Sequence, residues 1–127
     1  MRKLLLLAIA ILGISTAQAQ KITARDFAKA AQGQVGLDVG MGFVMKNIYA
    51  DGQTVVYVAE VPQNFAAPLR LGKNNPQVVK NAKQGVINTF SQLQLGPLFT
   101  EAKINIRYVY QYRGEHLMTV TIHWYDF

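Results

Sequence analysis

The sequence has no cysteine among its 127 residues. Disulfide bonds are therefore excluded, and so is a thiol nucleophile. Small exported proteins often depend on disulfides for their stability, so an exported chain of this composition must be held together by its sheet and helices alone. The absence is compatible with the bacterial periplasm as well as with other exported settings.

Side chains that carry catalysis are also few. There are 7 Asp and Glu and 2 His, and no two carboxylates have a spacing that indicates an acid–base pair. Ser91 is the only serine after Ser15 and has no histidine near it in the sequence. On one strand His116 and His123 point to opposite faces, whereas a metal site needs three or four convergent ligands. We therefore expect no enzyme activity, no metal site and no cofactor.

Long hydrophobic runs are limited to the amino terminus. Residues 4–14 form an apolar run that follows Arg2 and Lys3 and precedes Ala17-Gln18-Ala19, a sequence with the small residues of a signal-peptidase site. This is the layout of a secretory signal peptide. A membrane anchor is not expected, because the run is about half of the roughly 20 residues that an anchor needs. We predict cleavage after Ala19 and a single domain over residues 20–127, periplasmic or secreted, with no transmembrane segment.

The basic residues are not concentrated in any one segment. Thirteen Lys and Arg give a net charge of +6, and they form no run that would indicate a nucleic-acid arm. The aromatic residues between Tyr108 and Trp124 are typical of a base-stacking platform. They lie, however, on the strand face that we expect to pack against a helix, with Arg107 on the other face. We expect no nucleic-acid partner.

The clearest pattern is in residues 103–125, where apolar and aromatic residues at even positions alternate with mostly polar residues. A period of two is typical of strands with one buried face. The break at Arg113-Gly114-Glu115 is short and contains a glycine, which predicts a hairpin. The expected pairs across the buried face are Tyr112 with His116, Tyr110 with Met118, Tyr108 with Val120, Ile106 with Ile122 and Ile104 with Trp124.

A second hairpin is predicted from residues 41–50 and 53–61, joined at Asp51-Gly52. Tyr49 is expected on the same face of the first strand as Met45, and Ile48 on the opposite face. That opposite face is less polar than in the other hairpin, which indicates either partial cover on both sides or an exposed apolar strip for a partner. The glycines of residues 33–42 precede this hairpin and read as a connector, because no helix follows them to bind a dinucleotide.

Two helices are predicted. Thr23 is expected to cap a helix that ends at Gly33, and Asn75-Pro76 begins the main helix, which ends at Gly96-Pro97. Gly85 weakens the middle of that helix by about 1 kcal/mol relative to Ala and suggests a close approach to the sheet. The fold expected from this order is α+β, arranged α-β-β-α-β-β, with an antiparallel sheet of about four strands and helices on one face.

Residues 62–74 are expected to form a long loop, which is unusual in a compact domain and often functional. Phe65 and Leu69 make it less polar than most loops. Two interpretations stay open: a loop whose apolar side chains contact a partner, or a flap packed over one end of the core.

The polar face of the last hairpin is the best candidate site. A histidine among cations is expected to be neutral, and Arg107 with its neighbours could bind a carboxylate or a phosphate. The simpler interpretation is a solvated sheet face. The candidate residues are Lys103, Asn105, Arg107, His123 and Tyr125.

Residues 46–57, the polar helix after them and residues 98–112, with the Arg-Tyr-Val-Tyr sequence at 107–110, together resemble small, uncharacterised exported bacterial domains. The resemblance covers most of the mature chain, implies an α+β fold and assigns no functional residue. Members often carry a cysteine in the helix before the last hairpin, and this chain has none.

Two functions are consistent with these patterns. The first is a non-catalytic periplasmic protein-interaction module, of the accessory, inhibitor or immunity type, which offers a sheet face, a sheet edge or residues 62–74 to a protein of the periplasm or envelope. The alternative is a small anionic-ligand-binding protein that uses the polar face around Arg107 and His123.

Overall fold

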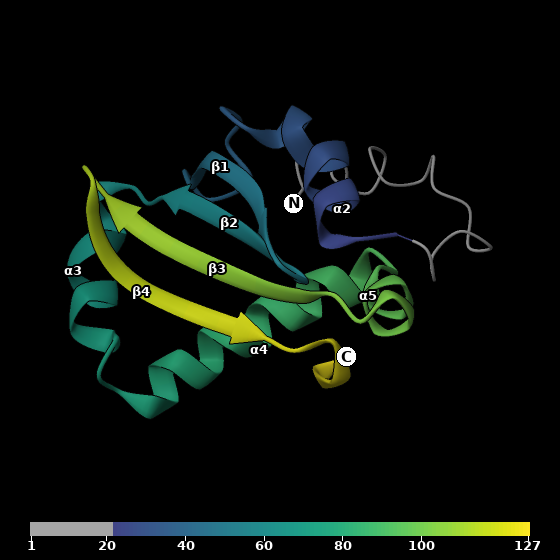
Figure 1. The fold of residues 1–127 in the computed structure, drawn as a ribbon. Helices are drawn as coiled ribbons and strands as arrows, with labels where there is room; N and C mark the ends of the chain where they lie inside the picture. Colours follow the sequence, from purple (N-terminus) through teal and green to yellow (C-terminus); the bar gives the residue numbers. More distant parts are fainter. Residues whose placement is uncertain (1–21) are drawn as a thin grey trace.

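A computed structural model describes residues 22–127 as an α+β fold built on a four-stranded mixed sheet. The predicted signal peptide, residues 1–19, lies outside the described residues. Figure 1 shows α4 running along the curved sheet. The elements are α2 (Ala24–Ala30), the 3-10 helix η2 (Ala31–Gln34), β1 (Val44–Asp51), β2 (Thr54–Glu60), α3 (Gln63–Gly72), α4 (Pro76–Gln92), α5 (Gly96–Ala102), β3 (Asn105–Tyr112), β4 (Glu115–Ile122) and the 3-10 helix η3 (Trp124–Asp126).

Both predicted hairpins are present, since β1 pairs with β2 and β3 with β4 in antiparallel fashion. The second turn places Arg113 and Gly114 at φ values of 47° and 81°, and two successive residues with positive φ form the type I′ turn that suits a hairpin. The register predicted for Tyr108 and Val120 is confirmed, as is that of the pairs on either side, Ile106 with Ile122 and Tyr110 with Met118.

The prediction of a purely antiparallel sheet is wrong, because β2 and β3 are parallel neighbours. The spatial order is β1-β2-β3-β4, so the two hairpins lie side by side. Three helices, α3, α4 and α5, connect the end of β2 to the start of β3. Parallel neighbours require a crossover of this kind, and its extra helices also make the predicted order α-β-β-α-β-β incomplete.

The helices contribute to one hydrophobic core with the inner face of the sheet. Phe99 of α5 contacts Phe27 of α2 and Phe90 of α4, with ring centroids 4.8 Å and 5.3 Å apart. Phe90 in turn lies 5.9 Å from the ring of Tyr57 on β2. Tilted and edge-on aromatic contacts of this kind stabilise a core beyond the area they bury. As expected, Val120 and Ile122 are buried on this face.

Residues 62–74 form a helix and not the predicted loop, because α3 spans Gln63–Gly72. Pro62, Pro68 and Gly72 favoured a loop, but Phe65 and Leu69 are four residues apart and therefore share one helix face. Both side chains are half-buried against the core, and the ring of Phe65 meets that of Phe43 edge-on at 5.0 Å.

Both predicted helix starts are confirmed. Thr23 and Asp26 form a reciprocal capping box at α2, and the Asn75 side chain accepts a hydrogen bond from the Gln77 amide at the start of α4. Helix α4 ends at Gln92, before the predicted Gly96-Pro97, which instead opens α5.

Strand irregularities change the predicted faces of β1 and one predicted cross-strand pair. A bulge between Met45 and Asn47 shifts the alternation of β1, because a bulge inserts one unpaired residue. Ile48 is consequently buried (1% exposed), whereas Tyr49 is 44% exposed, the reverse of the prediction. A second irregularity places Tyr112 opposite Glu115 and not opposite His116.

The carboxyl end leaves the sheet earlier than predicted. β4 ends at Ile122 and Trp124 begins the 3-10 helix η3, so the expected pair of Ile104 with Trp124 does not form. Within residues 22–127, no helix combines the length and apolar character that crossing a bilayer requires.

Candidate ligand-binding site

Of the predicted polar patch, Arg107 lies within β3 and the other residues lie at or beyond the strand ends. Arg107 Nη1 lies 3.3 Å from Asp51 Oδ2, and Lys103 Nζ lies 5.8 Å from the centre of the Trp124 ring. Asn105 accepts a hydrogen bond from the Trp124 amide at 3.0 Å. These three predicted residues therefore make contacts within the protein, and the Arg107 contact already supplies an anionic partner.

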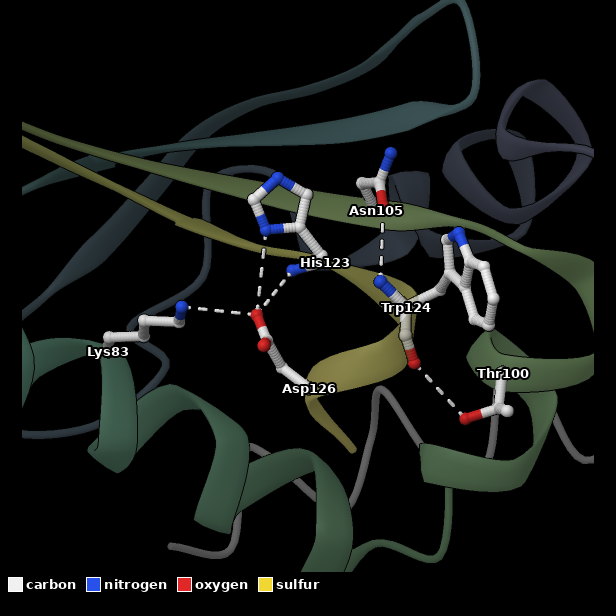
Figure 2. A network of polar contacts seen from close by, with 6 residues as sticks. All are labelled: Lys83, Thr100, Asn105, His123, Trp124 and Asp126. Carbon is white, nitrogen blue, oxygen red and sulfur yellow. Dashed lines mark hydrogen bonds and ion pairs between the residues drawn. The ribbon is translucent and has the colours of Figure 1, made fainter.

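His123 belongs to a separate cluster at the carboxyl end (Figure 2). Its amide donates to Asp126 Oδ2 at 2.8 Å, and its Nδ1 lies 3.6 Å from the same oxygen. Lys83 of α4 approaches that carboxylate at 3.1 Å. Burial opposes ionisation of Asp126, but the His123 amide and Lys83 more than offset it, so the pKa of Asp126 lies below its usual value. This cluster attaches η3 to α4.

Tyr125 stacks on His123 with ring centroids 5.0 Å apart, and Thr100 of α5 donates to the Trp124 carbonyl at 3.2 Å (Figure 2). The structure thus brings His123 and Tyr125 together, and Asn105 near Trp124. Phe65 and Leu69 lie on α3 against the core, apart from this patch. Within residues 22–127 no group of three or more His, Asp or Glu is placed to hold a metal ion.

A cavity of about 440 Å³ lies between α4 and the helix-covered face of the sheet. Small-molecule sites usually have volumes of roughly 300–1,000 Å³ and mostly apolar linings. We call this cavity the tyrosine pocket. Its lining residues are Gln34, Val39, Gly40, Met41, Phe43, Met45, Tyr57, Ala82, Gly85, Val86, Thr89, Phe90, Tyr108 and Tyr110.

The sheet side of the tyrosine pocket is built by adjacent strands. Tyr57 of β2 stands opposite Tyr108 of β3, and their rings stack at 5.6 Å with an angle of 12°. Tyr110, two residues along β3, lies 5.1 Å from Tyr108. The period of two therefore places three phenol side chains on one face.

Helix α4 covers the pocket, and Gly85 leaves a gap in this cover. Apart from the adjacent residues and the nearby backbone of α4 itself, no described atom lies within 4 Å of the position where a Cβ at Gly85 would stand. The suggested close approach of helix and sheet at this glycine is therefore wrong. Gly85 is exposed and lines the pocket, so the missing side chain leaves open space at this part of the lining.

The glycine-rich connector forms the remaining wall. Met41 has a φ of 57°, a left-handed conformation that residues other than glycine rarely adopt, and its side chain is 78% exposed. Backbone hydrogen bonds hold the segment: Val39 donates to Phe43 at 2.8 Å, and Phe43 donates to Gly40 at 3.0 Å. This wall therefore has a defined backbone and presents an apolar side chain at the pocket.

Two polar atoms in the lining have no hydrogen-bond partner among the described residues, namely the Tyr57 hydroxyl and Gln34 Oε1. Tyr57 is 1% exposed and Gln34, at the end of η2, is 4% exposed. Burial, with a smaller contribution from Tyr108, raises the pKa of Tyr57 well above its usual value. Burial also raises the pKa of Tyr108 and brings that of Tyr110 to about 12. The three phenols are thus neutral near pH 7.

Two features of the sequence indicate this pocket when they are taken together. Tyrosine, with a hydroxyl, occupies positions on the buried face where phenylalanine would fill a core. Gly85 lies within the apolar stripe of the helix that packs on that face. Phenol side chains that face a glycine on the covering helix indicate a space between helix and sheet. The distance between α4 and the sheet, however, cannot be derived from the sequence.

Comparison with known proteins adds no further assignment. No family model, no curated protein and no solved structure matches the chain.

Proposed function

We propose that the protein is a non-catalytic binding protein of the cell envelope and that its binding site is the tyrosine pocket. The observation that carries this proposal is the 440 Å³ cavity together with its lining. None of the described residues that line it carries a charge, so the pocket is suited to an apolar group. The ligand of this proposal is a small apolar molecule.

The mouth of the pocket supports this choice over the open sheet face. Met41, which lines the pocket, is exposed, and an exposed apolar side chain beside a recess favours entry of an apolar group. On the open sheet face, Tyr49 is exposed. Val56 is buried there beneath its neighbours, so a broad apolar interface with a protein partner has less support.

Gly85 allows a direct test of binding. Gly85→Leu would place a side chain into the pocket, and Gly85→Ala is the matched control because it removes the helix-weakening glycine with little filling. We expect the neutral dye Nile red to gain fluorescence with the wild-type protein and with Gly85→Ala. We expect Gly85→Leu to bind it at least tenfold more weakly while its unfolding temperature stays equal or higher.

Equal dye binding by wild type and Gly85→Leu would contradict the pocket as the site. The same set of proteins tests the anionic-ligand alternative. Inorganic phosphate that stabilises the wild type but not Arg107→Ala would support the polar face instead. A protein retained from periplasmic extract by wild type and by Gly85→Leu alike would support the protein-interaction function at another surface.

A further inference from the structure

The proposal that follows rests on the proposed function and names the ligand. We infer that the tyrosine pocket selects an uncharged molecule with an apolar body and one hydroxyl or amide head group, which bonds to Tyr57 and Gln34. Two independent features carry it: the partnerless polar atoms at the pocket and the charge-free lining.

The Tyr57 hydroxyl and Gln34 Oε1 belong to side chains that are almost fully buried and that line the pocket. A phenol can donate one hydrogen bond and accept others, and a carboxamide offers an acceptor oxygen and two donor hydrogens. Buried polar groups in folded proteins nearly always have partners. A hydroxyl or amide head group has both a donor and an acceptor, and would therefore satisfy both side chains.

Apart from the tyrosines, Gln34 is the only polar or charged residue that is buried among the described residues. It ends η2 and lines the same pocket as Tyr57, which lies on β2. Two elements separated in the sequence thus each contribute one buried polar side chain to the lining. A small number of polar groups in an otherwise apolar lining is typical of small-molecule binding sites.

The lining argues against an ionised ligand. None of the described lining residues is Lys, Arg, His, Asp or Glu, so a bound carboxylate, phosphate or ammonium would lose its hydration without gaining a counter-charge. Burying an unpaired charge is far more costly than burying a hydroxyl. The phenols also remain protonated near neutral pH and so can donate to an oxygen of the ligand.

Size sets a further limit. A lysozyme cavity of roughly 150 Å³ binds benzene, so a cavity about three times larger accepts a bicyclic ring with a head group. The probes are therefore four naphthalenes with one ring system: naphthalene itself, 2-naphthol, 2-naphthamide and 2-naphthoate. Their dissociation constants are measured at pH 7 by ligand-observed NMR and calorimetry, with the protein of residues 20–127.

We expect 2-naphthol and 2-naphthamide to bind about tenfold more tightly than naphthalene, the amount that one or two net hydrogen bonds supply. We expect 2-naphthoate to bind at least tenfold more weakly than 2-naphthol. Tyr57→Phe should reduce the preference for 2-naphthol over naphthalene to less than threefold and leave naphthalene binding unchanged. Tyr49→Phe, on the open sheet face, is the matched control and should keep the full preference.

The outcomes separate this inference from the proposed function. If naphthalene and 2-naphthol bind equally, water or another group serves the polar atoms, and the ligand class is wrong while the pocket still binds. Tight binding of 2-naphthoate would likewise overturn the ligand class. If no probe binds and Gly85→Leu leaves Nile red binding unchanged, both fail. A Gln34→Met variant that lowers the preference as Tyr57→Phe does would add independent support.

Discussion

Replacing Tyr57 with Phe removes a buried hydroxyl that has no hydrogen-bond partner among the described residues. Leaving such a group unsatisfied costs about 1–3 kcal/mol, whereas the ring keeps its contacts with Phe90 and Tyr108. Because Phe keeps the whole ring, the substitution removes only the contacts of the hydroxyl itself. We therefore expect Tyr57→Phe to raise the free energy of unfolding by about 1–3 kcal/mol.

For a domain of about 100 residues, each kcal/mol shifts the unfolding temperature by about 4–8 °C. The assay is urea and thermal unfolding of both proteins at pH 7 without added ligand, followed by circular dichroism. Tyr49→Phe removes an exposed hydroxyl and should change stability by less than about 0.5 kcal/mol. A Tyr57→Phe protein no more stable than the wild type would refute the reasoning, because the hydroxyl would then have a partner.

Three other predictions concern stability. The pKa of Tyr110 is raised to about 12 in the folded protein and is about 10 in the unfolded chain. The contribution of Tyr110 to the free energy of unfolding is therefore complete below pH 10. Between pH 10 and pH 12 this contribution falls by about 1.4 kcal/mol per pH unit. A urea midpoint that is constant from pH 9 to 12 would contradict this. Gly72→Ala should destabilise by about 1–3 kcal/mol, because its Cβ would stand 2.5 Å from Val78 Cγ1; thermal unfolding at wild-type temperature would refute the clash. Gly85→Ala, whose Cβ meets no described atom within 4 Å, should stabilise by about 0.5–1 kcal/mol, and the same melting experiment checks it.

The strand pairs within each hairpin could be predicted because the alternation and the turns are local signals. The β3–β4 register was recovered at Tyr108 and Val120 from the sequence pattern alone. The parallel pairing of β2 with β3 could not be predicted in this way. It depends on the path of the connecting helices, and that path is set by contacts between residues far apart in the sequence.

Residues 62–74 show how local signals can conflict. Pro68 cannot donate a backbone hydrogen bond and usually ends a helix, so a loop was the natural prediction. The helix persists because Phe65 and Leu69 both reach the core, and because Arg70 of α3 makes two hydrogen bonds of 2.7 Å to Glu115 of β4. Tertiary packing decided the structure, as it often does when intrinsic propensity is weak.

The candidate site was predicted less well than the fold because the relevant property is an empty volume. The polar residues of the open sheet face were visible in the sequence by their alternation. Tyr108 and Tyr110 of the tyrosine pocket were correctly expected on the helix-packed face, but the other pocket residues were not assigned to it. The bulge at Met45 and the distance between α4 and the sheet, however, follow from packing in three dimensions.

Two features of the tyrosine pocket lower the stability of the folded chain. Glycine at position 85 costs about 1 kcal/mol relative to Ala, and the partnerless Tyr57 hydroxyl costs about 1–3 kcal/mol, in a protein whose expected total is about 5–15 kcal/mol. Ala at one position and Phe at the other would fit without obstruction. Both destabilising residues border the same cavity, although they come from a helix and a strand far apart in the sequence. Under the proposed function, a ligand in the pocket would account for both residues, and the Gly85→Leu and Tyr57→Phe proteins test the two halves of this explanation.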